Sequence, residues 1–79
     1  MGRVSATTVI DVRDVPFWRR LPSILQAVDA LAPGEALELW VDIDPWPLRA
    51  HLDATRAGQW QWQEIESGPQ VWRVRLQRV

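Results

Sequence analysis

Residues 36–43 alternate strictly between two kinds of side chain. Positions 37, 39, 41 and 43 are aliphatic, positions 38 and 42 are acidic, and position 40 is a tryptophan. Because successive side chains of a strand point to opposite faces, this pattern predicts a strand with one buried face and one open face. A sheet that contains this strand is therefore expected to be covered on one side only.

Three further segments have strand character. β-Branched residues dominate residues 7–12, and alternation recurs in residues 59–66 and 70–77. A Ser-Gly-Pro turn separates the last two segments, which predicts an antiparallel hairpin. Residues 1–6 show no such pattern, so we expect a flexible start followed by a single domain over residues 7–79.

Two helices are predicted between the strands. Apolar residues recur at helical spacing from about residue 19 to residue 32, and this start places Pro22 in the first turn, where a proline is tolerated. Asp44 is expected to cap the second helix, with Pro45 as its first residue and Arg56 near its end. The predicted order of elements is therefore βαβαββ.

This order predicts a two-layer α/β (α+β) sandwich. A helix joins the first two strands, so they should be parallel, and two helices can cover only one face of a mixed four-stranded sheet. The side chains expected to face the helices are Ile10, Val12, Leu37, Leu39, Val41, Trp60, Trp62, Trp72, Val74 and Leu76. Those expected on the open face are Asp11, Glu38, Trp40, Asp42, Arg73 and Arg75. If the second and fourth strands are neighbours, acidic residues of one oppose arginines of the other.

The composition excludes several classes of chemistry. The 79 residues include no Cys and no Lys, and His51 is the only histidine, which removes thiol and Schiff-base nucleophiles and histidine-based metal sites within one chain. The net charge of −1 argues against a nucleic-acid partner, and no apolar run is long enough to span a membrane. We therefore expect a cytoplasmic protein that is not an enzyme and that holds no cofactor or metal.

Several motifs together resemble those of one known family. They are Ile-Asp-Val-Arg (10–13), Ala-Leu-Ala-Pro-Gly-Glu-Ala-Leu (30–37), Asp-Pro-Trp-Pro-Leu (44–48), Gly-Gln-Trp (58–60) and Gly-Pro-Gln-Val-Trp-Arg-Val-Arg (68–75). Over residues 8–78 the chain resembles the uncharacterised bacterial family called domain of unknown function 2249, a relative of the TusA/SirA-like sulfur carriers. The resemblance implies a βαβαββ sandwich with strand order 1-2-4-3. It also implies an association with hemerythrin-like proteins and with redox or nitrogen-oxide metabolism.

Two departures from these related patterns bear on function. The sulfur carriers have a Cys-Pro pair before the first helix, whereas Phe17 and Trp18 stand there in this chain, so sulfur transfer by a thiol is excluded. Many members of the resembled family carry two histidines, and the matching positions here are Leu21 and Ile43. A metal or haem role supported by those histidines is therefore not expected for this chain.

The candidate site lies where the first two strands end. Parallel strands bring their carboxyl ends to one edge of a sheet, where open α/β sheets tend to bind ligands. The loops and helix starts at this edge carry Arg13, Trp18, Arg20, Asp42, Asp44 and Trp46. One interpretation is a small anion or an acidic peptide, held by the two arginines beside the two tryptophans. The other is local: the aspartates cap a helix or pair with the arginines, and the tryptophans cover the helix ends.

Trp40 is predicted to lie on the open face, either as an interface anchor or as a ring stacked against an arginine. Arg73, Arg75 and Arg78 are expected to form a basic strip beside it, which the acids of the second strand should neutralise. We interpret the protein as a small, non-enzymatic interaction or accessory domain that binds an unidentified protein or a second copy of itself. The alternative is a sensor of small anions that uses the arginines at the strand ends.

Overall fold

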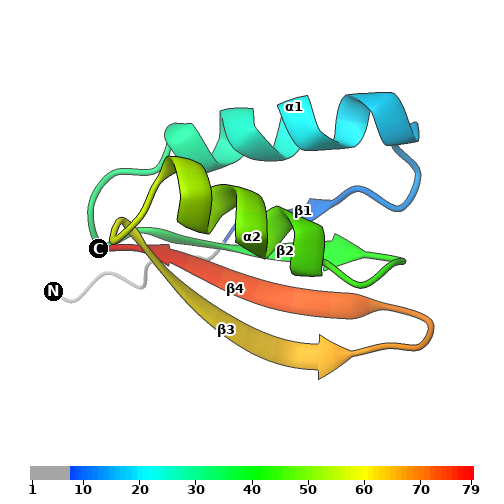
Figure 1. The fold of residues 1–79 in the computed structure, drawn as a ribbon. Coiled ribbons are helices and arrows are strands. Elements are labelled where there is room, and N and C mark those ends of the chain that lie inside the picture. Colours follow the sequence, from blue (N-terminus) through cyan, green and yellow to red (C-terminus); the bar gives the residue numbers. More distant parts are fainter. Residues whose placement is uncertain (1–7) are drawn as a thin grey trace, which may run out of the picture.

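The computed structural model describes residues 8–79. The elements follow the predicted order: β1 (Thr8–Asp11), α1 (Phe17–Asp29), β2 (Ala36–Val41), α2 (Trp46–Thr55), β3 (Trp60–Ser67) and β4 (Trp72–Arg78). Figure 1 shows both helices on the same side of the sheet. The flexible start predicted for residues 1–6 lies outside the described part of the chain. Within residues 8–79, neither helix is long and apolar enough to cross a membrane.

The sheet is mixed, with strand order β1-β2-β4-β3. β1 runs parallel to β2, as the helical crossover between them requires. β4 pairs antiparallel with both β2 and β3. The predicted sandwich and its strand order are confirmed, and the described sheet ends at β1 on one side and at β3 on the other.

The core lies between the sheet and the two helices. Leu37 faces Leu76 and Leu39 faces Val74 across β2 and β4, and all four side chains are buried. The helices complete the core with Ile24 and Val28 from α1 and with Leu48 and Leu52 from α2. The three predicted inward tryptophans of the hairpin are Trp60, Trp62 and Trp72, which are partly buried against this core. Burial of these apolar side chains is the main force that holds the layers together.

α1 starts earlier than the periodicity predicts. It runs from Phe17 to Asp29, so Pro22 lies inside the helix and not in its first turn, and the predicted start at residue 19 is wrong. The proline nitrogen cannot donate the hydrogen bond that a helix interior normally contains. The early start is fixed from outside the helix, because the guanidinium of Arg20 binds the carbonyl oxygens of Arg13 and Val15 in the preceding loop.

Local irregularities also end two of the predicted alternations. β2 stops at Val41, so Ile43 leaves the buried face and is 45% exposed in the following loop. A bulge between Glu64 and Glu66 in β3 shifts the register, so Glu64 stays on the helix side with Trp62 while Glu66 pairs with Arg73 on the open side. The sequence pattern shows neither change, because both depend on pairing with neighbouring strands.

Candidate functional site

The amino ends of the two helices and the adjoining loop form an exposed apolar surface, which we call the helix-end surface. It consists of Phe17, Trp18, Leu21, Ile43 and Trp46. Trp18 is 79% exposed, Trp46 is 65% exposed and Phe17 is 61% exposed. Phe17, Leu21 and Ile43 line one groove, and Trp46 lines the neighbouring pocket. Large apolar side chains that stay this exposed in a small protein mark a surface available for binding.

An apolar groove of about 320 Å³ opens between the amino ends of α1 and α2. Phe17, Leu21 and Ile43 form part of its rim, and the core residues Val12, Ile24 and Leu48 lie at its walls. Leu21 and Ile43, which stand where the resemblance implies two histidines, both line this groove. His51 also lines it, but no group of three metal-ligating side chains occurs within residues 8–79.

Arg20 connects three segments beside this groove. Its guanidinium donates to the carboxylate of Asp42 at 2.7 Å and to the carbonyl oxygens of Val15 at 2.8 Å and Arg13 at 3.0 Å. Its side chain is only 12% exposed, and its guanidinium carbon lies 4.4 Å from the centre of the Phe17 ring. Arg20 is therefore engaged within the chain, where it fixes the loops after β1 and β2 to α1.

The two predicted site aspartates bind different groups. Asp42 binds Arg20, and this hydrogen bond holds the pKa of the Asp42 carboxyl below its ordinary range. Asp44 instead accepts a hydrogen bond from the backbone N–H of Trp46 at 2.9 Å. Pro45 takes the capping position and α2 begins at Trp46, so the predictions of Asp44 as the cap and Pro45 as the first helical residue are each wrong by one residue. The local interpretation agrees with the structure for Asp42, which pairs with an arginine, but not for Asp44 as the cap.

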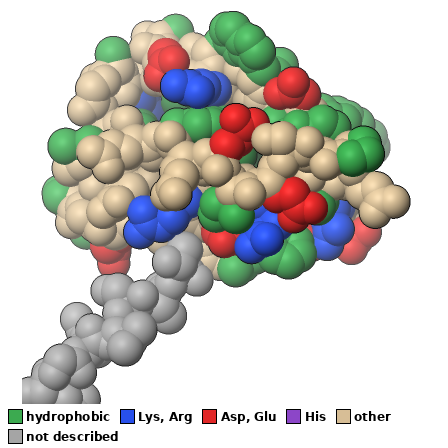
Figure 2. Space-filling model, turned by 90° about the horizontal axis from the view of Figure 1, so that it is seen from below, with side chains coloured by type: hydrophobic (Ala, Val, Ile, Leu, Met, Phe, Trp, Pro, Cys, Tyr) green, Lys and Arg blue, Asp and Glu red, His purple; other side chains and the backbone are tan. Residues whose placement is uncertain are grey.

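The open face of the sheet is organised around Trp40, which is half-buried. The guanidinium carbons of Arg13 and Arg73 lie 5.3 and 5.0 Å from the centre of its ring, within cation–π range. Its indole N–H donates to Glu38, whose carboxylate also binds Arg73 at 2.9 Å. Figure 2 shows acidic and basic side chains next to one another across this face. Trp40 is thus a ring stacked between arginines.

The carboxylates of this face are held in their charged form by their partners. Hydrogen bonds from Arg13 lower the pKa of Asp11 from its ordinary value of 3.8 to about 2. The pKa of Glu38 is lowered first by the hydrogen bond from Trp40 and then by Arg73. These groups stabilise one another, whereas Arg75 on the same face makes no ion pair within residues 8–79 and donates to the side-chain oxygen of Gln77 at 2.9 Å.

The predicted basic strip on β4 is smaller than the sequence suggests. Arg78 lies on the helix-facing side with Val74 and Leu76, and its guanidinium donates to the carbonyl oxygen of Leu31 at 2.8 Å. Arg73 is paired with both Glu38 and Glu66. The inclusion of Arg78 in the strip is wrong, because alternation along β4 carries its side chain to the other face.

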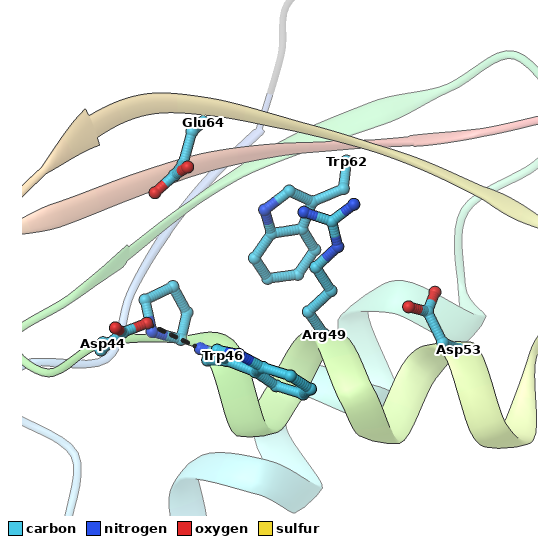
Figure 3. A pocket seen from close by; sticks show the side chains of 7 residues that line it. Asp44, Trp46, Arg49, Asp53, Trp62 and Glu64 are labelled. Atoms are coloured by element: carbon cyan, nitrogen blue, oxygen red, sulfur yellow. Dashed lines mark hydrogen bonds between the residues drawn. The ribbon is translucent and has the colours of Figure 1, made fainter.

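A second cavity, of about 380 Å³, lies between α2 and β3, and it is not among the sites predicted from the sequence. We call it the aromatic-acidic pocket; its lining side chains are Asp44, Pro45, Trp46, Arg49, Asp53, Trp62 and Glu64. Figure 3 shows Arg49 reaching from α2 to the ring of Trp62, and the guanidinium carbon lies 5.7 Å from the ring centre. The spacing of Trp46, Arg49 and Asp53 along one helix face is the only signal of this pocket in the sequence.

Comparison with known families gives one match. Residues 9–78 match the model of the family described as uncharacterized conserved protein (DUF2249). The chain belongs to this family. The match extends from β1 to the last residue of β4 and so includes the helix-end surface, the groove and the aromatic-acidic pocket. No curated protein and no solved structure matches the chain.

Proposed function

We propose that this DUF2249 domain is a non-enzymatic interaction module that binds a protein partner through the helix-end surface. The observation that carries the proposal is the exposure of Phe17, Trp18 and Trp46 beside an apolar groove. Tryptophans near the centre of an interface are frequent anchors of binding energy. Partner binding would remove from water the apolar area that the fold leaves uncovered there.

The other surface considered for a partner is the open face of the sheet. Its tryptophan is already engaged by neighbouring side chains, which favours the helix-end surface as the binding face. Trp40 is covered by Arg13 and Arg73 and has its N–H bonded to Glu38. A partner that used Trp40 would first have to displace these groups. Trp18 and Trp46 need no such rearrangement, because their rings already lie in solvent.

The sensing of small anions is less well supported. Both arginines assigned to it are paired within the chain, Arg13 with Asp11 and Arg20 with Asp42. An incoming anion would have to replace a carboxylate that is already bound at 2.7 Å. We further propose a distant relationship to the TusA/SirA-like sulfur carriers, with the same strand order but without the thiol, and a cytoplasmic location.

Site-specific photo-cross-linking in living cells tests the proposed interface while the partner is still unidentified. A photoreactive phenylalanine derivative replaces Trp18 in one variant, Trp46 in a second, and the exposed open-face residue Gln63 in a third. We expect the same cross-linked protein from positions 18 and 46 and none from position 63. Cross-linking to another copy of the chain would show that the partner is the domain itself. Cross-linking from position 63 alone would contradict the proposal.

A further inference from the structure

The charge around the helix-end surface indicates the chemistry of the partner. On the basis of the proposed function, we propose that the bound partner segment carries an apolar side chain next to a basic one. The apolar side chain fills the groove between α1 and α2, and the lysine or arginine side chain enters the aromatic-acidic pocket.

The two cavities are adjacent. Asp44 and Pro45 line both the apolar groove and the aromatic-acidic pocket, so the two open on either side of the same short loop before α2. Trp46, the next residue, is exposed and also lines the pocket. A single extended or helical segment can therefore place neighbouring side chains in both cavities.

The charge of the pocket is complementary to a cation. Its lining contains three carboxylates, Asp44, Asp53 and Glu64, against one arginine, Arg49. The ion pairs found within residues 8–79 use other carboxylates, namely Asp11, Asp29, Asp42, Glu38 and Glu66. The polar contacts of Asp44 and Glu64 are with a backbone N–H and with the hydroxyl of Ser67, and neither carboxylate makes an ion pair within residues 8–79.

The aromatic wall of the pocket already accommodates a cation. Arg49 lies over the ring of Trp62, and Figure 3 shows the carboxylates of Asp44 and Glu64 on one side of this pair and Asp53 on the other. A guanidinium or ammonium group is attracted by an indole face and by nearby carboxylates together. Arg49 therefore acts as an internal occupant that a partner's basic side chain joins or displaces.

Selection from a phage-displayed library of random short peptides on the full chain tests this inference. We expect the enriched peptides to share an apolar residue next to Lys or Arg, and to lose binding when Trp46 is replaced by Ala. For one enriched synthetic peptide, the double variant Asp53→Asn/Glu64→Gln should weaken binding about tenfold. Asp14→Asn, which changes an exposed carboxylate outside the pocket, should weaken it less than about twofold.

A variant that should strengthen peptide binding separates the pocket's contribution from a folding defect, because a misfolded domain would bind more weakly. Arg49→Gln removes the internal cation and should strengthen binding of the same peptide several-fold. Enriched peptides without basic residues, or equal effects of the pocket variants and Asp14→Asn, would overturn the inference, and so would a library that yields no peptide dependent on Trp46. These results would leave the proposed function intact, because cross-linking from positions 18 and 46 tests that function separately.

Discussion

The open face of the sheet and the helix ends, where the helix-end surface adjoins the aromatic-acidic pocket, both contain tryptophans and carboxylates but use them differently. On the open face, Trp40 lies between two arginines, and Asp11 and Glu38 each bind an arginine. At the helix ends, Trp18 and Trp46 are exposed, and the nearby carboxylates of the aromatic-acidic pocket have no ion-pair partner within the described chain.

This difference separates groups that stabilise the fold from groups that remain available for binding. A charged or aromatic side chain that already has its partner gains little from a second one, because the first contact must be broken. An exposed indole beside unpaired carboxylates has no such cost. The number of tryptophans in a sequence therefore says less about binding than the partners that each one finds in the fold.

The largest expected effect comes from removing the indole on the open face. Trp40→Ala deletes a half-buried ring, its contacts with Arg13 and Arg73, and its hydrogen bond to Glu38, and should lower the free energy of unfolding by about 2 kcal/mol. The matched variant Trp18→Ala should change it by less than about 0.5 kcal/mol. Urea denaturation of both variants measures the difference. Equal losses would remove the distinction between the two surfaces.

A smaller loss is expected at the arginine that fixes the loops of the candidate site. Arg20→Ala removes hydrogen bonds to Asp42, Val15 and Arg13 and should lower the free energy of unfolding by about 1–2 kcal/mol. Arg19→Ala is the control, since Arg19 is exposed. Thermal unfolding of the two variants provides the comparison. If Arg20→Ala left stability unchanged while it abolished binding of a small anion, the sensor interpretation would replace ours.

The paired carboxylates should also make the domain sensitive to acid. The pKa values of Asp11, Glu38 and Asp42 are lower in the folded chain than their ordinary values, so the unfolded chain binds more protons at low pH. Their contribution to stability is present above about pH 4.5 and is lost as the pH falls toward 2. Denaturation curves recorded over this range should show the loss. High salt should flatten the profile, because it screens exposed ion pairs; a profile that rises toward pH 2 would contradict the assignment.

The fold could be predicted from the sequence because periodicity and topology agree. Alternation in residues 36–43 predicts β2, and the helix before it makes β2 parallel to β1. The short turn after β3 predicts the antiparallel hairpin of β3 and β4. The start of α1 could not be predicted, since Arg20 fixes it through carbonyl groups of the preceding loop. Hydrophobic spacing carries no information about such a contact.

The candidate site could be predicted only in part. The strand ends alone predict that Trp18, Trp46 and the two aspartates lie beyond the carboxyl ends of β1 and β2, and the order of elements places them there. The aromatic-acidic pocket depends on Glu64 of β3 lying opposite Arg49 and Asp53 of α2, and alternation along a strand does not tell which helix residues face it. Whether each arginine is free or paired also depends on distances between segments far apart in the sequence, as for Arg20 and Asp42.

The most direct test of the helix-end surface as the binding face uses the tryptophans themselves. Each indole N–H gives its own signal in a nitrogen–proton correlation spectrum, and single Trp→Phe variants assign the signals. The measurement is a titration of the labelled domain with the protein captured by cross-linking at position 18. We predict that the signals of Trp18 and Trp46 shift or broaden while that of Trp40 stays in place. A shift of Trp40 with Trp18 and Trp46 unchanged would contradict the account.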